Sequence, residues 1–501
     1  MTERVFTSAG IRAIDAELAR LDLLELTMEH AGARVAAALH ARAPRGRILV
    51  LAGRGANGGD ALVAARHLQA LGRGVTVLAL TSRHDLTRRM HGRLAHLLPV
   101  TPLTPGALSD ALRDADVVLD GLLGTGFVPP LRDDVAELVR CVNAWHHRSR
   151  GVTFSIDVPS GLPSDTVEHG DAAVLADVTL ALVGPKPALL FGDVGDVTTL
   201  NLGVPRHVLD RHAAATLTGD GDVAALLPRR TRGAHKGTAG RIWVLGGTPG
   251  YAGAPAMTAL GALRAGAGLV SVYSRTDVPH HFPEVMPHRV NDWADLPARE
   301  RPDAVAVGMG LREEGSAVAR AVLSWEVPTV VDADALQRDV RGAGHEHVVW
   351  TPHPGEAARM LGAGVADVTR DPLSAARELQ RAYGGTVVLK GGPTTVATPH
   401  ETRVCPRGNP GMGTGGMGDV LSGVIAALLG QGLPGPEAAV AGVHLHALAG
   451  DLAYARLGYG LVATDVAHEI ARAWVALVGN ASGGAFGSVP PSRVSFTDHL
   501  D

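Results

Sequence analysis

The densest run of glycines in the chain leads directly into an aspartate. Glycine recurs between Gly411 and Gly418, and Asp419 then precedes the apolar run Val420–Leu429, which predicts a helix. Backbone N–H groups in such a loop can converge on an anion at the helix N-terminus. Asp419 could then accept a proton from a substrate hydroxyl while the amides stabilise a transferred phosphoryl group. The alternative is a flexible loop in which Asp419 only caps the helix, and the apolar helix directly after the loop disfavours it.

Three further strand ends in the second half could meet the same ligand. Lys390–Thr394 follows the predicted strand Thr386–Leu389, and its amides and lysine suit a nucleotide phosphate. His353 lies between the predicted strand Val348–Trp350 and a helix start, although a lone histidine is more often structural. Gly308–Gly310 is another turn at a strand end. In parallel sheets, ligands bind outside the carboxyl ends of the strands, so these turns are candidate binding elements.

A glycine-rich turn also follows the first predicted strand of the chain. Gly53, Gly55 and Gly58 form the pattern G-x-G-x-x-G before a predicted helix. This turn could bind a diphosphate at the helix N-terminus, or it could simply be a tight turn. A dehydrogenase of this type should carry an acidic residue at the end of the second strand. Here Val75–Leu80 is followed by Thr81–Arg83, which disfavours hydride transfer.

Polar side chains end the other predicted strands of the first half. Asp120 ends one strand, Asp157 and Ser160 follow another, and Lys186 stands between two prolines after a third. A single aspartate there is more often a helix cap or a turn former. Two aspartates beside glycine-rich loops favour a ligand site, in which Lys186 is a candidate acid–base partner and not only a surface lysine.

Alternating strand and helix signals position these residues. Helical periodicity fills the intervals between strands, for example at Ala61–Leu71 and Val135–Trp145. This alternation predicts an α/β protein with a parallel sheet in each half. The predicted strands are Ile48–Leu51, Val75–Leu80, Val117–Leu119, Val152–Ile156 and Val178–Val183 in the first half, and Ile242–Leu245, Leu269–Tyr273, Ala304–Val307, Thr329–Val331, Val348–Trp350 and Thr386–Leu389 in the second.

Composition restricts the function class and the compartment. Hydrophobic residues make up 46% of the 501 residues, enough for sizeable cores. The formal net charge is −4 without a basic block, so we expect no nucleic-acid partner. Cys141 and Cys405 are the only cysteines, which indicates a reducing compartment. Neither a signal peptide nor a membrane span is visible in the sequence, so we expect a cytoplasmic protein with no membrane partner.

The segment between the two halves is polar and rich in glycine. We interpret Asn201–Val223 as a linker between two different modules. The tail, residues 481–501, is rich in glycine, serine and proline, and we expect it to be flexible.

The first half resembles the NAD(P)H-hydrate epimerases, also called the YjeF N-terminal family, over residues 1–215. Four motifs in order support the resemblance: G-x-G-x-N-G-G-D from Gly53, D-x-x-x-G-T-G-F from Asp120, D-V-P-S-G from Asp157 and G-x-K-P from Gly184. Thr27–Gly32 looks like the leading helix of that family. The chain departs from the family at Ala56, where asparagine is usual, and at Ala61, where glycine is usual.

This resemblance implies a Rossmann-like three-layer domain with a potassium ion held by Asn57, Asp120 and Ser160. Oxygen ligands of this kind suit an alkali cation. It implies that Asp157 and Lys186 move the proton in epimerisation. The residues implied to contact the substrate are Ala56, Asn57, Gly58, Gly59, Asp60, Gly124, Thr125, Gly126, Phe127, Val128, Pro129, Pro130 and Asp157.

The second half resembles the ribokinase-like NAD(P)H-hydrate dehydratases, the YjeF C-terminal family, over residues 222–480. His235–Gly237, Tyr251–Pro255 and Val331–Leu336 fit this pattern together with the glycine loop, whereas Met309 stands where proline is usual. The residues implied to contact the hydrated nicotinamide are Ala254, Gly310, His353 and Asp419. Those implied to contact ADP or AMP are Lys390, Gly391, Gly392, Pro393, Thr394 and Gly418.

Together the two resemblances imply a bifunctional repair enzyme, an isomerase joined to a lyase. The first half would interconvert the R and S epimers of NADH hydrate and NADPH hydrate. The second would dehydrate the S epimer while ADP is converted to AMP and phosphate, with magnesium as phosphate counter-ion. We expect a homo-oligomer. Two alternatives stay open: an ATP-dependent kinase for a vitamin precursor or a sugar in the second half, and a nucleotide- or protein-binding module in the first.

Overall fold

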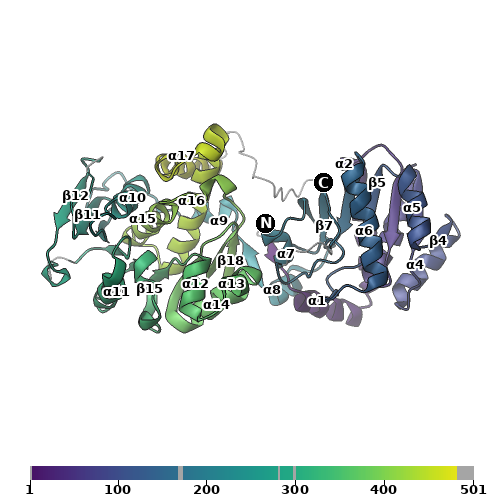
Figure 1. Cartoon of the computed structure of the whole chain (residues 1–501), viewed down its shortest axis with the longest axis horizontal. Helices are drawn as coiled ribbons and strands as arrows, with labels where there is room; N and C mark the ends of the chain where they lie inside the picture. Colours follow the sequence, from purple (N-terminus) through teal and green to yellow (C-terminus); the bar gives the residue numbers. More distant parts are fainter. Residues whose placement is uncertain (1–2, 168–172, 280–281, 297–300, 482–501) are drawn as a thin grey trace. The chain divides into compact units, whose positions relative to one another are not determined.

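The computed structural model describes residues 3–167, 173–279, 282–296 and 301–481 (Figure 1). The chain divides into two compact units. The N-terminal unit holds Glu3–Ala214, and the C-terminal unit begins at Ala215. The predicted tail lies outside the described residues, except for Ala481 at the end of the last helix.

The N-terminal unit is built on a parallel sheet of strand order β4-β3-β2-β5-β6-β7-β8. The strands are β2 (Ile48–Ala52), β3 (Val75–Ala79), β4 (Val100–Pro102), β5 (Val117–Gly121), β6 (Val152–Ile156), β7 (Val178–Leu182) and β8 (Asp196–Leu200), and the short β1 (Arg4–Val5) precedes them. The helices are α1 (Ser8–Arg20), α2 (Leu24–Arg42), α3 (Ala56–Ala70), α4 (Asp85–Ala95), α5 (Pro105–Asp114), α6 (Asp133–Arg148), α7 (Pro187–Phe191) and α8 (Arg206–His212).

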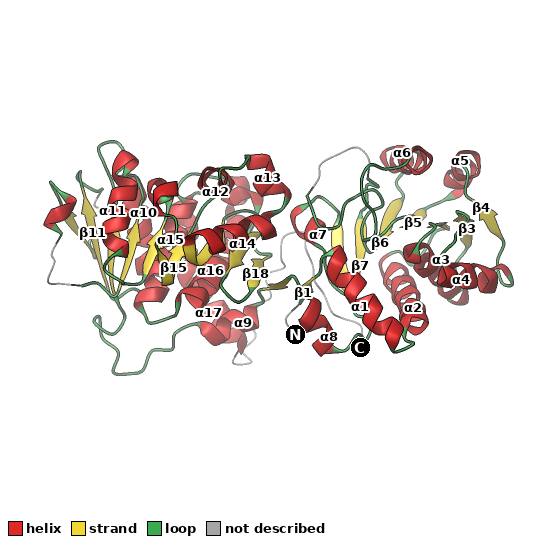
Figure 2. Ribbon diagram, turned by 90° about the horizontal axis from the view of Figure 1, so that it is seen from below, coloured by secondary structure: helices red, strands yellow, loops and turns green. Residues whose placement is uncertain are grey.

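Both faces of this sheet are covered by helices. Figure 2 shows α5 and α6 on one side and α2, α3 and α4 on the other. Along β2, Ile48, Val50 and Ala52 pack into the core beneath α2 and α3, while Leu49 and Leu51 pack beneath α5 and α6. Successive side chains of a strand point to opposite faces, so a run that is apolar throughout predicts a strand buried on both sides.

The C-terminal unit has a larger sheet, whose strand order from β9 to β12 is β9-β18-β17-β16-β15-β14-β13-β10-β11-β12. Only the pairs β16–β17 and β17–β18 are antiparallel. The strands are β9 (Ala215–Leu217), β10 (Arg241–Leu245), β11 (Leu269–Ser274), β12 (Val285–Arg289), β13 (Ala304–Val307), β14 (Thr329–Val331), β15 (Gly344–Trp350), β16 (Gly384–Leu389), β17 (Thr394–Ala397) and β18 (Thr402–Cys405).

Helices also cover both faces of this second sheet. Figure 2 shows α12 and α13 on one side and α9 and α17 on the other. On β10, Ile242 and Val244 face the core that contains α10, α15, α16 and α17, and Trp243 and Leu245 face the opposite core. The helices are α9 (Asp220–Leu226), α10 (Gly253–Arg264), α11 (Gly315–Leu323), α12 (Pro354–Leu361), α13 (Val365–Arg370), α14 (Pro372–Tyr383), α15 (Met417–Gly430), α16 (Gly435–Leu457) and α17 (Ala463–Ala481).

The α/β prediction is confirmed, and every predicted strand is present with shifts of a few residues at its ends. The boundary between the two units, after Ala214, lies within the predicted linker Asn201–Val223, but this segment is folded and is not a simple linker. This segment contains α8 and β9 and begins α9. Its apolar residues Ala215 and Leu217 are buried, and β9 pairs with β18 in parallel, so tertiary packing overrides the polar local composition.

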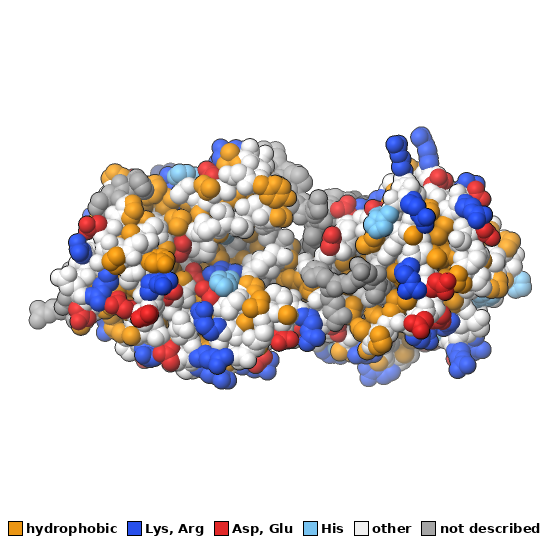
Figure 3. Space-filling model, in the orientation of Figure 1, with side chains coloured by type: hydrophobic (Ala, Val, Ile, Leu, Met, Phe, Trp, Pro, Cys, Tyr) orange, Lys and Arg blue, Asp and Glu red, His pale blue; other side chains and the backbone are white. Residues whose placement is uncertain are grey.

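Acidic and basic side chains are mixed over the face of the molecule shown in Figure 3. Among the described residues, no helix is both long and apolar enough to cross a bilayer.

Two candidate active sites

A cavity of about 510 Å³ opens at the carboxyl ends of the N-terminal strands. β2 ends at Ala52, and Gly55 caps α3, so the predicted glycine turn brings a helix N-terminus to this cavity. The residues that line it are Ile11, Arg12, Asp15, Leu18, Leu24, Thr27, Met28, Ala31, Gly55, Ala56, Asn57, Asp60, His84, Leu86, Leu122, Leu123, Gly124, Thr125, Gly126, Phe127, Asp157, Leu182, Val183, Lys186 and Leu202.

Several predicted contact residues lie away from this lining. Gly58 and Gly59 serve close packing, because a Cβ at Gly58 would lie 2.1 Å from the carbonyl oxygen of Gly53, and one at Gly59 would lie 2.7 Å from Met28. Val128–Pro130 is exposed, with Val128 at 78% exposure, and does not line the cavity.

Asp157 and Lys186 form an ion pair inside the cavity wall. The Lys186 ammonium is fully buried and also donates to the carbonyl oxygens of Leu182 (2.7 Å) and Gly184 (3.1 Å). Asp157 and Val183 both have positive φ, +69° and +68°. Such strain in non-glycine residues is typical of sites where a side chain must be held in one direction. The structure therefore brings the two predicted acid–base residues together.

Two further carboxyl groups line the same cavity, and both escaped the sequence-based search for acid–base residues. Asp15 lies on α1, where partial burial and the charge of Asp157 raise its pKa to about 6. Asp60, predicted only as a substrate contact, is buried on α3, and burial followed by the charges of Asp157 and Asp15 raises its pKa well above the usual range. Three carboxyl groups near one ammonium can differ in protonation, which acid–base catalysis requires.

Asn57, Asp120 and Ser160 meet behind this cavity around the loop at Leu123. The Ser160 hydroxyl lies 2.6 Å from Asp120 Oδ1, and the Asn57 amide donates to the carbonyl oxygens of Leu123 (2.6 Å) and Ile156 (3.1 Å). Asp120 is fully buried, and burial raises its pKa even though it accepts hydrogen bonds from uncharged donors. The structure thus assembles carbonyl, hydroxyl and carboxylate oxygens with no cationic side chain bound to Asp120 among the described residues.

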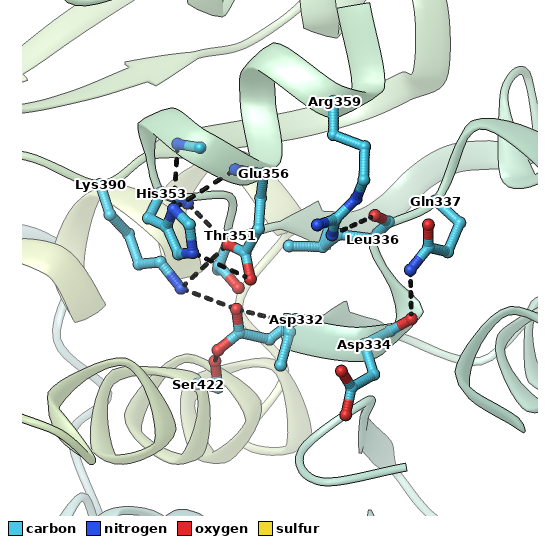
Figure 4. A network of polar contacts seen from close by, with 12 residues as sticks. Asp332, Asp334, Leu336, Gln337, Thr351, His353, Glu356, Arg359, Lys390 and Ser422 are labelled. Atoms are coloured by element: carbon cyan, nitrogen blue, oxygen red, sulfur yellow. Dashed lines mark hydrogen bonds and ion pairs between the residues drawn. The ribbon is translucent and has the colours of Figure 1, made fainter. Parts of the chain in front are cut away.

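The C-terminal site centres on Lys390, which follows β16 (Figure 4). Its ammonium donates to Asp332 Oδ1 (2.7 Å) and lies 3.9 Å from Glu356 Oε2. Ser422, on α15, donates to the other oxygen of Asp332 at 2.8 Å. A Cβ at Gly418 would lie 3.1 Å from Lys390 Nζ, so the glycine loop and the start of α15 approach this lysine closely.

Charge coupling in this cluster favours proton transfer near neutral pH. Burial, followed by the charge of Asp332, raises the pKa of Asp419 to about 7. Burial also raises the pKa of Glu356 to about 7. For Lys390 and Asp332, burial opposes ionisation, but their mutual attraction outweighs it, so the pKa of Lys390 is raised and that of Asp332 is lowered. Asp419 can therefore exchange a proton while Lys390 stays cationic.

His353 is the N-cap residue of α12. Its Nδ1 accepts hydrogen bonds from the backbone N–H groups of Gly355 (3.0 Å) and Glu356 (3.3 Å). In turn, the Glu356 carboxylate accepts a hydrogen bond from the backbone N–H of His353. The Nε2 of His353 lies 3.5 Å from Glu356 Oε1, beside the Lys390 cluster. His353 thus caps the helix that carries Glu356 into the site.

The remaining predicted residues of the second half lie on nearby turns. A Cβ at Gly310, whose φ is +69°, would lie 2.8 Å from the carbonyl oxygen of Tyr251, just before Ala254 at the start of α10. Gly391 and Gly392 are exposed, and Thr394 donates to the carbonyl oxygen of Gly391 at 2.8 Å, which closes the turn between β16 and β17. In Figure 3 the C-terminal unit is hollowed where histidine, basic and acidic side chains gather.

Family models match both halves of the chain. One, described as NAD(P)H-hydrate dehydratase, matches residues 242–472, and one described as YjeF-related protein N-terminus matches residues 25–188. A bifunctional NAD(P)H-hydrate repair enzyme of Escherichia coli K12 is 38% identical over 85% of this chain and 84% of that protein. A protein of the same description from Coxiella burnetii is 37% identical over 88% of this chain and 92% of that protein. The chain belongs to the family of bifunctional NAD(P)H-hydrate repair enzymes.

A solved structure is similar to about half of this chain. It is an ADP/ATP-dependent NAD(P)H-hydrate dehydratase from Bacillus subtilis co-crystallised with ATP and Mg²⁺, 30% identical with a TM-score of 0.49. It covers 52% of this chain and 98% of that chain. The predicted family and enzyme class are confirmed.

Asp332 and Glu356 belong to the candidate C-terminal site, but they are not among the site residues predicted from the sequence. Asp332 lies within Val331–Leu336, which carries part of the family resemblance, and Glu356 lies three residues after the predicted site residue His353. Their position after parallel strands, next to an expected phosphate-binding lysine, is the signal that could have identified them. Asp15 follows no strand and belongs to no such motif.

Proposed function

We propose that the C-terminal unit dehydrates the S epimer of NADH hydrate and NADPH hydrate with conversion of ADP to AMP and phosphate. The observation that carries this proposal is the meeting of Asp419, Lys390 and the glycine loop at Gly418. Asp419 removes the proton of the substrate hydroxyl, whose oxygen attacks the terminal phosphoryl group of ADP, and AMP departs. The carbon–oxygen bond of this phosphate ester then breaks, and inorganic phosphate leaves with the electron pair. The neighbouring ring carbon loses a proton to solvent, and the electrons of its carbon–hydrogen bond restore the double bond.

Lys390 and the loop amides bind the nucleotide phosphates in this proposal. The Lys390 ammonium neutralises phosphate charge, and the N-terminus of α15 adds favourable electrostatics to the transferring group. Contacts to the nucleotide come from the turn Gly391–Thr394, and contacts to the hydrated ring from Ala254, Gly310 and His353. Magnesium is the proposed counter-ion of the nucleotide phosphates, which commonly bind this ion together with one or two carboxylates.

The N-terminal unit, in the same proposal, interconverts the R and S epimers. Asp157 and Lys186 transfer the proton in the cavity. The substrate contacts the cavity lining at Ala56, Asn57 and Asp60, at the start of α3, and at Gly124–Phe127. A potassium ion fits beside Asn57, Asp120 and Ser160, because a fully buried carboxylate there has only uncharged partners. A bound cation would supply the positive charge that keeps Asp120 ionised and would fix the loop at Leu123.

We also propose that the chain acts in the cytoplasm as a homo-oligomer. Both cysteines are free, which suits a reducing compartment.

The test is incubation of mixed hydrate epimers with ADP while the near-ultraviolet band of reduced nicotinamide is followed. We expect complete recovery of NADH with one AMP formed per NADH. Asp419→Asn should reduce this rate by about 10²-fold or more, since it removes the general base. A stable phosphorylated product without NADH recovery would instead support a kinase, and an Asp419→Asn variant of undiminished rate would contradict the role of Asp419.

A further inference from the structure

We propose that Asp15 is a second proton-transfer group of the epimerase site, working opposite Asp157 on the bound hydrate. This inference rests on the epimerase activity proposed above. It assigns catalysis to α1, an element that contributes no glycine turn and no strand end.

The helix α1 presents one face to the cavity. Ile11, Asp15 and Leu18 all line it, at the spacing that places residues on one side of a helix. Leu18 is buried, and Ile14 beside it is fully buried in the core. The helix is fixed at its start by a hydrogen bond from the Gly10 backbone to Thr7. The Asp15 carboxyl is therefore held on a rigid element and open to the ligand space.

The two carboxyl groups have different partners. Asp157 binds the buried ammonium of Lys186, whereas Asp15 forms no hydrogen bond or ion pair with its carboxyl within the described part of the chain. Partial burial and the nearby charge of Asp157 raise the pKa of Asp15 to about 6. Because this pKa lies close to neutral pH, Asp15 can carry the proton that it donates as the acid of an acid–base pair.

Other titratable groups around the cavity do not duplicate this arrangement. Asp60 faces it from α3 but is buried, and burial raises its pKa well above the usual range. His84 precedes α4, where its Nδ1 is occupied by Thr87. Arg12 lies one turn from Asp15 on the same helix and supplies positive charge for phosphates and not a proton.

Epimerisation of the hydrate needs an acid and a base. Hydration of a reduced nicotinamide puts the hydroxyl on the ring carbon bonded to nitrogen. Asp157 removes the hydroxyl proton as the carbon–nitrogen bond breaks to give an aldehyde, and Asp15 gives its proton to the nitrogen that receives the bonding electrons. After the aldehyde rotates, the nitrogen attacks its other face, returns a proton to Asp15, and the oxygen takes one from Asp157. Both side chains end as they began.

The test uses the full chain, because its dehydratase activity, measured in the same reaction, serves as an internal control for the amount of folded protein. With mixed epimers and excess ADP, the S epimer is consumed in a first phase and the R epimer in a second, limited by epimerisation. We expect Asp15→Asn to leave the rate of the first phase unchanged. The rate of the second phase, after subtraction of the uncatalysed rate of epimerisation, should fall by about 10²-fold or more. The second phase of the unmodified chain should slow as pH rises through about 6, and Asp15→Glu should restore part of the rate.

Glu17→Gln is the matched control. It makes the same chemical change on the same helix, but Glu17 binds Arg211 and His212 and does not line the cavity. The inference would be overturned if the second-phase rate of Asp15→Asn stayed within about threefold of that of the unmodified chain, or if Glu17→Gln lost as much of this rate as Asp15→Asn. Either result would leave the proposed epimerase activity intact. Absence of any second phase in the unmodified chain would instead refute the epimerase activity itself.

Discussion

In both units, a lysine side chain is held by carboxylates from other elements. Lys186 binds Asp157, 29 positions earlier, and Lys390 binds Asp332, 58 positions earlier. A buried ammonium is tolerated only when partners compensate for its lost hydration. These ion pairs fix the direction of each lysine before any ligand binds.

Gly418 tests how closely the glycine loop must approach Lys390. An added Cβ would lie 3.1 Å from Lys390 Nζ and 3.6 Å from Asp332 Oδ2, so the lysine must move to accept it. We expect Gly418→Ala to reduce dehydratase activity by about 10- to 100-fold, because small displacements of a positioned group are costly. NADH recovery from pure S hydrate measures this activity. Epimerase activity of the same variant is the control, and a parallel loss of both would contradict the explanation.

The residues that could be predicted from the sequence are those next to strand ends. Asp120, Asp157 and Lys390 follow apolar runs, and parallel strands bring such positions to one edge. Asp15 could not be found in this way, since only tertiary packing of α1 brings it to the cavity.

At the scale of elements, a polar network anchors the first helix of the C-terminal unit. Asp220, at the start of α9, binds Arg407 at 2.7 and 2.9 Å and His444 of α16 at 2.7 Å. Asp451, also on α16, accepts a hydrogen bond from Asn409 at 3.0 Å. The network therefore joins α9 and α16 to the residues that begin the glycine loop.

This network makes the stability of the C-terminal unit depend on pH. Burial alone would lower the pKa of His444, but Asp220 and Cys405 outweigh it and raise that pKa from 6.5 to about 9. His444 therefore stabilises the fold fully below pH 6.5, and its contribution is lost as pH rises through about 9. The change is on the order of 3 kcal/mol, from about 1.4 kcal/mol per pKa unit.

Urea unfolding between pH 6 and pH 9 measures this effect. We expect the free energy of unfolding of the C-terminal unit to fall over this range, and the fall to be much smaller in His444→Gln. Asp220 affects stability at acidic pH, because its partners outweigh the effect of burial and lower its pKa from 3.8 to about 2. Its contribution is present above pH 3.8 and is lost as pH falls through about 2. An identical pH dependence in His444→Gln would contradict the assignment.

The same elements explain why the predicted linker segment is folded. Thr216–Asp222 is polar and contains two glycines, which locally favours a loop. Pairing of Leu217 with Val404 and the contacts of Asp220 depend on residues more than 180 positions away. A longer apolar run predicts a strand by itself, whereas the three residues of β9 are too few to do so.

For the whole molecule, each unit has its own hydrophobic cores. The cluster around Leu119 and Leu62 contains only residues of the N-terminal unit, and the cluster around Val244 and Ile425 only residues of the C-terminal unit. We therefore expect two separable unfolding transitions, because cooperative units follow contiguous cores.

Calorimetry with and without ADP tests this expectation. ADP at about 100 times its Kd should raise the free energy of unfolding of the C-terminal unit alone, by about 2.7 kcal/mol. Leu119→Ala, at a fully buried position, should lower the free energy of unfolding of the N-terminal unit alone, by about 2–5 kcal/mol. A single transition that moves with both changes would show that the two units unfold together.

The burial of Lys186 and the ion pairing of Lys390 have a practical consequence for labelling. Lysine occurs in this sequence only at positions 186, 236 and 390. Lys186 is sealed from solvent, and the Lys390 amine is engaged by carboxylates, whereas Lys236 is exposed. Among the lysine side chains, an amine-directed fluorophore or surface-coupling reagent should therefore attach at Lys236, without any substitution.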